Sequence, residues 1–177
     1  MLEGVKGFFR SRALAKYAST EPTRITPIGK IRSAVAFIDV EDTSFNECKV
    51  ALMNFFRERN IKGDIFFFDF RKLTEGERLI TSITTTVLRK DLNWYGRPAR
   101  EKVDLMLEGE PDMFISLLRK SDFPIHFMAA ASKAHFKVGR VQLPGNIFDV
   151  VVSDPEDAPI SEFGIFREMC KLFEKIQ

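Results

Sequence analysis

The chain has 177 residues, enough for one domain, and its apolar (45%) and charged (29%) fractions are those of an ordinary globular protein rather than a disordered or fibrous one. Its net charge of +2 is too small to indicate nucleic-acid binding, and no segment approaches the roughly 18 consecutive apolar residues of a membrane span, so we expect neither a DNA partner nor a membrane span. Charge is unevenly distributed: residues 1–32 carry seven basic and two acidic side chains, a local charge of +5.

Residues 1–19 combine apolar and basic side chains in the pattern of an amphipathic helix. Residues 20–32 follow, and Pro22, Pro27 and Gly29 interrupt any regular structure there. We therefore expect a basic amphipathic helix and linker over residues 1–32, appended to a single α/β domain over residues 33–177.

Within that domain, strand-like and helix-like segments alternate. Continuous apolar or β-branched runs predict strands over residues 33–40, 64–70, 78–91, 112–118, 135–141 and 147–154. Helical patterns occupy residues 44–60 and 98–109, a segment that begins at Ser121 or Asp122, and residues 160–176. The spacing of Ser44 and Glu47 predicts a capping box at the first of these helices.

Apolar strands that alternate with helices indicate a three-layer α/β fold, built on a mostly parallel, doubly wound (Rossmann-like) sheet. Such sheets bind ligands outside the carboxyl ends of their strands. This rule selects Asp39, Asp69, residues 117–120 and Asp154 as candidate site positions.

Two further features concern the setting of the protein. Cys48 and Cys170 are far apart in sequence and form no disulfide framework, which favours a reducing cytoplasm. Eighteen phenylalanines predict an apolar core and some apolar surface for a subunit interface, so we expect a homo-oligomer; any protein partner or small ligand stays unknown.

Several stretches resemble a family of small α/β proteins of unknown function found in Bacteroidetes. The resemblance rests on Asn-Trp-Tyr-Gly-Arg-Pro at 93–98, Ala-Ser-Lys-Ala-His-Phe-Lys-Val-Gly at 131–139, Ile-Gly-Lys-Ile at 28–31, Phe-Asp-Val-Val-Val at 148–152 and the basic first helix. It implies a compact single domain in the bacterial cytoplasm and carries no catalytic residues with it.

The segment from Phe37 to Ser44 resembles the Asp-x-Asp-x-Thr motif of haloacid dehalogenase phosphatases. Asp39 would be the nucleophile, Glu41 the second carboxylate and Thr43 the third position, with Mg²⁺ between carboxylate oxygens. Asp154 and Asp157 could supply the later acidic pair. Glu41 departs from the motif by one methylene, and acidic residues after a strand commonly just begin a helix, so the structural interpretation competes with the catalytic one.

Asp39 and Asp69 both follow apolar strands and could form a divalent metal site at one edge of the sheet. The alternative is that each carboxylate is bound separately by loop amides. We predict no cofactor unless the hydrolase interpretation holds, in which case Mg²⁺ is expected.

Residues 126–140 contain both histidines, His126 and His135, but a spacing of nine residues puts them on opposite faces of a continuous helix. The alanines of this stretch favour close packing of a helix on a sheet. Lys133, Lys137 and Arg140 are candidate anion-binding residues, although the sequence has no glycine-rich phosphate loop.

Trp94, Tyr95 and Arg97 form a mixed aromatic and basic patch, which is a candidate partner surface or the edge of the core. Residues 111–140 are also similar to part of a glycosyltransferase nucleotide fold, without a sugar-nucleotide motif. Three interpretations follow: a non-catalytic binding or assembly module, which we favour, a Mg²⁺-dependent phosphatase-like hydrolase using Asp39, and a nucleotide or sugar-nucleotide binding domain.

Overall fold

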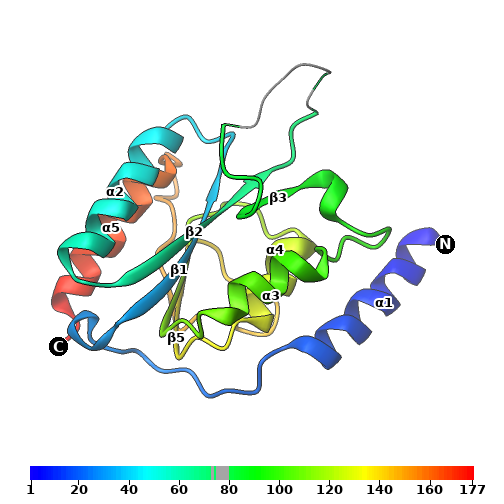
Figure 1. The fold of residues 1–177 in the computed structure, drawn as a ribbon, viewed down its shortest axis with the longest axis horizontal. Helices are drawn as coiled ribbons and strands as arrows, with labels where there is room; N and C mark the ends of the chain where they lie inside the picture. Colours follow the sequence, from blue (N-terminus) through cyan, green and yellow to red (C-terminus); the bar gives the residue numbers. More distant parts are fainter. Residues whose placement is uncertain (73, 75–79) are drawn as a thin grey trace.

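A computed structural model of the chain describes residues 1–72, 74 and 80–177. Its core is a six-stranded sheet in the order β3-β2-β1-β4-β5-β6, and every neighbouring pair of strands is parallel (Figure 1). The strands are β1 (Ser33–Asp39), β2 (Lys62–Asp69), β3 (Thr86–Leu88), β4 (Met113–Ser116), β5 (Phe136–Gly139) and β6 (Val150–Val151). The predicted parallel α/β class is confirmed.

Helices cover both faces of this sheet, which makes three layers. They are α1 (Leu2–Tyr17), α2 (Phe45–Glu58), α3 (Arg100–Glu108), α4 (Phe123–Ala131) and α5 (Glu162–Lys175). Helices α2 and α5 pack together on one face, while α1, α3 and α4 lie on the other (Figure 1). Strand β1 is buried between the two layers, with Ala36 and Ile38 toward α2 and Phe37 toward the opposite layer, as its continuous apolar run predicts.

The first helix is not free of the main body. Backbone hydrogen bonds of 2.8 Å from Ser19 N–H to the Ala130 carbonyl and of 2.7 Å from Arg24 N–H to the His135 carbonyl tie the segment after α1 to the region around α4. Ala13 of α1 is buried against that layer. The division of the chain at residue 32 stays a prediction.

Two predicted strands are much shorter in the structure. Of the segment 78–91, residues 78 and 79 lie outside the described residues, only Thr86–Leu88 pair as a strand, and Arg89–Asp91 form a 3-10 helix. The last strand retains only Val150–Val151, which pair with β5 at the edge of the sheet. None of the helices within the described ranges is long and apolar enough to cross a membrane.

Candidate functional site

The strand order reverses between β1 and β4, and the carboxyl ends of these strands mark the place where doubly wound sheets bind ligands. A shallow pocket of about 240 Å³ lies there. Its walls come from the end of β1, the loop after β4, the end of β5 and the start of α5. The sequence-based rule thus selected a region that the structure does hollow out.

Lys120, in the loop after β4, bridges two carboxylates across this point. Its ammonium nitrogen lies 3.0 Å from Asp39 Oδ2 and 3.4 Å from Glu41 Oε2. Burial opposes ionisation of the amine, but the two carboxylates outweigh it and raise the pKa of Lys120. Asp39 also accepts a hydrogen bond of 2.9 Å from the Glu41 N–H, so the candidate nucleophile is held by a cation and an amide.

A second ion pair lies deeper. The guanidinium of Arg140 is 1% exposed, and its Nε donates a 3.0 Å hydrogen bond to Asp154 Oδ2. It also donates to the carbonyls of Leu117 and Ile160. Arg140 lowers the pKa of Asp154, with a smaller contribution from Arg119 at 3.7 Å. This arginine therefore joins the loops after β4, β5 and β6.

The β1–α2 loop caps the amino terminus of α5. Asp42 Oδ2 accepts from the Glu162 N–H at 3.3 Å, and Ser44 Oγ accepts from the Phe163 N–H at 3.0 Å. Ser44 Oγ itself donates to Asp42 Oδ1 at 2.6 Å. The predicted capping box of Ser44 and Glu47 is wrong, because the Ser44 hydroxyl serves the neighbouring helix and makes no cap bond to its own.

Glu162 lies beneath Asp39, and sequence reasoning missed it. Its carboxyl group is 2% exposed and accepts the Asp39 N–H at 3.0 Å. Burial is the main cause that raises the pKa of Glu162 to about 9, with the nearby charges of Asp42 and Asp39 acting in the same direction. An acidic residue in the first turn of a helix ordinarily indicates only a favourable helix-end charge, so no sequence signal pointed to its burial.

The remaining residues of the phosphatase and metal-site interpretations do not line this pocket. Asp69 is buried at the end of β2 and is bound by the guanidinium of Arg71 at 2.7 Å, which lowers the pKa of Asp69. Thr43 and Asp157 are exposed. Within residues 1–72, 74 and 80–177, no group of three or more His, Cys, Asp or Glu side chains is arranged to hold a metal ion. A Mg²⁺ site on Asp39 and Asp69 stays a prediction.

The three basic residues proposed for anion binding are distributed along β5. Lys133 is exposed before the strand, while Arg140 follows it at the carboxyl edge of the sheet. Lys137 is 5% exposed, and its ammonium donates at 3.0 Å to the Ala129 carbonyl near the end of α4, a favourable position for a cation. Burial lowers the pKa of Lys137 to about 8. Of the three, only Arg140 meets the acidic strand ends.

The Trp94–Arg97 turn receives the first helix. The Phe9 ring lies 5.2 Å from Trp94 and 5.9 Å from Tyr95, and Arg10 Nε donates at 2.8 Å to the Tyr95 carbonyl. Trp94 remains 55% exposed. This patch is therefore a docking surface for α1 that leaves part of its indole in solvent.

A known family matches the chain over nearly its whole length. The family of unknown function DUF6913 covers residues 6–175, which include most of α1, the whole sheet and α5. The chain belongs to this family. No curated protein and no solved structure matches it. Membership of DUF6913 assigns no residue a role, so the chemistry of the site rests on its geometry.

That geometry is a network of mutually satisfied charges. Asp39, Asp69 and Asp154 are each bound by a cation, and the loop after β1 reads Val-Glu-Asp-Thr-Ser, without the glycines that let backbone amides cradle a phosphate. A ligand at this pocket would have to displace Lys120 from its two carboxylates. The arrangement is suited to holding loops together.

Proposed function

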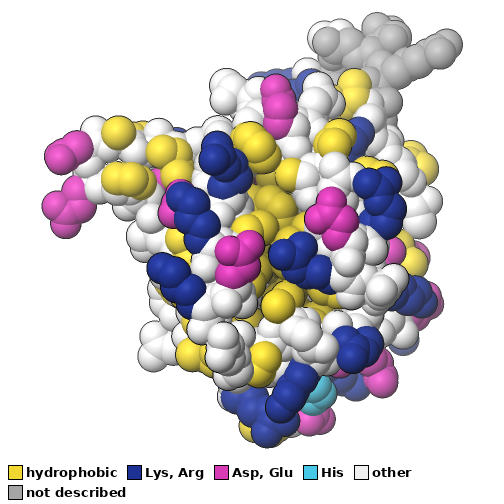
Figure 2. Space-filling model, turned by 90° about the vertical axis from the view of Figure 1, so that its left-hand side faces the viewer, with side chains coloured by type: hydrophobic (Ala, Val, Ile, Leu, Met, Phe, Trp, Pro, Cys, Tyr) yellow, Lys and Arg dark blue, Asp and Glu magenta, His cyan; other side chains and the backbone are white. Residues whose placement is uncertain are grey.

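We propose that this member of DUF6913 is a non-catalytic assembly module that self-associates through helices α2 and α5. The observation that carries the proposal is an apolar groove between these two helices, on the outer side of the sheet. Figure 2 shows hydrophobic side chains along its floor, with Lys, Arg, Asp and Glu side chains on both rims. Two adjoining hollows, of about 310 and 530 Å³, form it.

The apolar content of this face exceeds what the domain core needs. Phe55 and Phe166 are buried beneath the groove, and Phe163 lines it while partly covered. Val50 of α2 also lines the groove and is 53% exposed. Apolar side chains at the centre of a charged rim are typical of a protein–protein interface, and their burial by a partner stabilises the complex.

Charge favours a second copy of the same chain as the partner. Helix α2 has two acidic and two basic side chains, and α5, apart from the buried Glu162, has two acidic and three basic side chains. Two copies related by a two-fold axis can place these charges opposite complementary ones without net repulsion. Residues 1–32, at +5, would repel their own copy, so the surface of α1 is less suited to self-association.

The setting that we propose is the bacterial cytoplasm. The resemblance to Bacteroidetes proteins supports the bacterial origin. Cys48 and Cys170 are free cysteines, as expected for a protein kept in reducing conditions. Burial raises the pKa of both thiols, to about 11 for Cys170, which keeps them protonated and unreactive at neutral pH.

Light scattering after gel filtration tests the assembly proposal. We expect the wild-type chain to be a dimer at about 100 µM, and the variant Val50→Glu to be a monomer, because a charge buried in the interface by each copy opposes association. The matched control is Ile25→Glu, since Ile25 is 54% exposed and does not line the groove. Circular dichroism confirms that each variant is folded.

Two outcomes would contradict the proposal. The first is a wild-type chain that remains monomeric at this concentration. The second is a dimer that survives Val50→Glu or that is lost in the control variant, since the interface would then lie elsewhere.

A further inference from the structure

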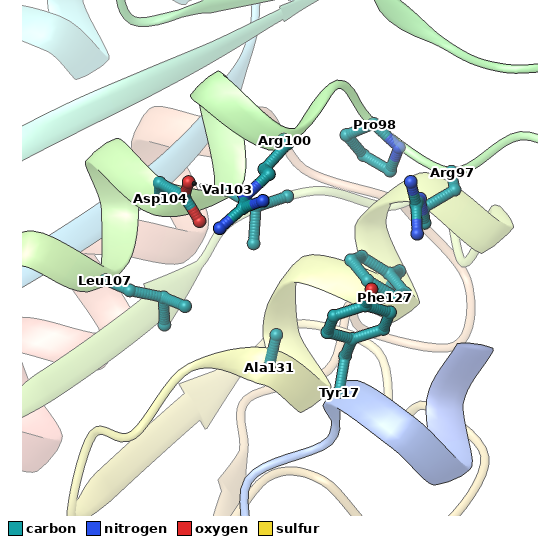
Figure 3. Close-up of a pocket in the computed structure, with 9 residues that line it drawn as sticks. All are labelled: Tyr17, Arg97, Pro98, Arg100, Val103, Asp104, Leu107, Phe127 and Ala131. Carbon is teal, nitrogen blue, oxygen red and sulfur yellow. Dashed lines mark hydrogen bonds and ion pairs between the residues drawn. The ribbon is translucent and has the colours of Figure 1, made fainter.

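A cavity of about 220 Å³ lies on the opposite side of the sheet from the α2–α5 groove, where the end of α1, residues 97–98, α3 and α4 meet (Figure 3). Its floor is apolar: Val103, Phe127 and Ala131 are 8%, 3% and 3% exposed. Residues at helical spacing on α3, from Arg100 to Leu107, form one wall. Figure 3 shows these side chains around a common space rather than filling it.

The rim of this cavity carries a guanidinium that is bound to a ring and not to a carboxylate. Arg97 lies with its guanidinium carbon 5.5 Å from the centre of the Tyr17 ring. Its backbone N–H donates to the Asn93 side chain at 2.9 Å, which holds the turn in place. In the part of the chain that the structure describes, Arg97 forms no ion pair, whereas Arg100 on the same rim is paired with Asp104 at 3.1 Å.

Three further features make the neighbourhood of Arg97 favourable for a negative charge. The Tyr17 hydroxyl points toward Arg97 and is a potential hydrogen-bond donor (Figure 3). Lys16 and, to a smaller extent, Arg97 lower the pKa of Tyr17, which reflects the positive potential there. The first turn of α3 has no side-chain cap, because its N-cap residue is Ala99, and its positive dipole end adds to that potential.

We propose that this cavity binds a small monocarboxylate with an apolar, preferably aromatic, body. The carboxylate would accept from the guanidinium of Arg97, whose fork of N–H groups matches a carboxylate in a bidentate arrangement. The apolar body would cover Val103, Phe127 and Ala131 and displace water from them. Such a site is separate from the proposed interface between copies.

Size and charge restrict the ligand class. Pockets for drug-sized molecules usually measure about 300–1,000 Å³, so a cavity of about 220 Å³ fits a smaller body, such as one phenyl ring with a short chain. One guanidinium without an acidic partner balances one negative charge. The other guanidinium on the rim, that of Arg100, is already paired with Asp104, so a second anionic group would find no free cation among the residues that line the cavity, which disfavours phosphates and dicarboxylates.

The cavity also links two parts of the molecule. Tyr17 belongs to α1, whereas Arg97, Val103 and Phe127 belong to the main body. The ring of Tyr17 lies 5.8 Å from that of Phe127 across the boundary. A ligand between them would contact both parts at once and would stabilise the docked position of α1.

Isothermal titration of the full chain with 3-phenylpropionate tests the proposal, with 3-phenylpropanamide as a neutral ligand of the same shape. We expect a Kd for the acid between about 10 µM and 1 mM, and binding of the amide at least about tenfold weaker, because charged hydrogen bonds to arginine are lost. The substitution Arg97→Gln should weaken binding of the acid by a similar factor and leave the affinity for the amide nearly unchanged. The substitution Ala131→Leu should abolish binding of both ligands, because the larger side chain would occupy the apolar floor of the cavity.

Arg59→Gln is the matched control. Arg59 also lies over an aromatic ring, at 4.3 Å from the Phe55 centroid, but on the far side of the sheet. This variant should bind the acid as the wild type does. If Arg97→Gln is unfolded, the proposal is tested by the difference in affinity between acid and amide on the wild-type chain. Equal affinity for acid and amide, unchanged binding by folded Arg97→Gln, or no saturable binding at about 10 mM would overturn the proposal.

Discussion

The ammonium of Lys120 lies 3.0 Å from a carboxylate oxygen of Asp39, and this ion pair spans the gap between β1 and β4 where the strand order reverses. The crevice that holds ligands in many doubly wound folds is thus bridged by the protein's own side chains. Beneath it, Arg140 and Asp154 join the later loops, and Glu162 supports the backbone of Asp39. The carboxyl edge of the sheet is thus held together by three sets of contacts: the exposed Lys120–Asp39 pair, the Arg140–Asp154 pair, and the buried Glu162.

The two ion pairs should contribute differently to stability. Lys120 is 45% exposed, so we expect Lys120→Met to change the free energy of unfolding by less than about 1 kcal/mol. Arg140 is 1% exposed, and Arg140→Met would remove its hydrogen bonds to Asp154 and to the Leu117 and Ile160 carbonyls. We expect a loss of about 2–3 kcal/mol, although Arg119 still contacts Asp154 and the Ile160 carbonyl, and the Ile160 N–H still donates to Asp154. Urea unfolding of both variants at neutral pH measures the difference. Equal losses of unfolding free energy in the two variants would show that burial does not determine how much each ion pair stabilises the fold.

Glu162 should make stability depend on pH. The unfolded chain ionises this residue at its ordinary pKa of 4.5, whereas burial raises the pKa of Glu162 in the folded state to about 9. Between these values the folded state binds the extra proton, so the free energy of unfolding falls as pH rises. The loss reaches about 3 kcal/mol by pH 7. Glu162→Gln, which is neutral at every pH, should be more stable than the wild type at pH 7 and should lack this slope.

The measurement is urea unfolding at several values between pH 5 and pH 8. The upper limit matters because Lys137, with its pKa lowered from 10.5 to about 8, adds a slope of opposite sign above pH 8. There the unfolded chain binds more protons, and stability rises with pH until about 10.5. A wild-type chain and a Glu162→Gln variant with parallel pH profiles below pH 8 would contradict the assignment.

The hydrolase interpretation has a direct test in thermal melting with Mg²⁺ and orthovanadate, a phosphate analogue. We expect no change in Tm, because Asp39, Asp69 and Asp154 are each bound by a different cation. A ligand at one hundred times its Kd would add about 2.7 kcal/mol to the free energy of unfolding, which is readily visible. A rise in Tm that Asp39→Asn abolishes would support the phosphatase interpretation instead.

Gly139, which lies between the candidate anion-binding residues Lys137 and Arg140, has a packing role. A Cβ atom at this position would lie 2.4 Å from the ring of Phe148, which stacks on Phe114. Gly139→Ala should therefore cost about 1–3 kcal/mol of unfolding free energy through overpacking. Gly4→Ala is the control, since nothing lies within 4 Å of its added methyl group and alanine favours the helix. Urea unfolding that finds Gly139→Ala as stable as the wild type would remove the packing explanation.

Sequence patterns predicted those elements that have a continuous apolar centre. Strands β1 and β2 each pair with a neighbour on both sides, and the buried stretches 34–38 and 66–68 within the runs 33–40 and 64–70 are entirely apolar. The Thr-rich segment 78–91 misled because β-branched residues favour extended structure whether or not a strand partner is available along the whole length. Of its described residues, 80–91, only Thr86, Val87 and Leu88 pair with β2.

Side-chain partners were harder to predict than elements. Ser44 has the spacing of a capping residue, yet its hydroxyl caps α5, a helix 119 residues later in the chain. Glu162 and Arg140 look like surface residues in sequence, and they are buried because the loops after β1, β4 and β6 converge on them. Contacts of this kind depend on strand order, which local periodicity does not contain.

By itself, the sequence determined the three-layer α/β class, most of the helices and central strands, and the edge of the sheet where charged residues gather, because hydrophobic periodicity and the position of residues after strands are local properties. Only the tertiary structure decided that β1 and β4 are neighbours, that Asp39 pairs with Lys120 and that Arg140 and Glu162 are buried. It also created the α2–α5 groove and the Arg97 cavity, since each is formed by segments distant in sequence.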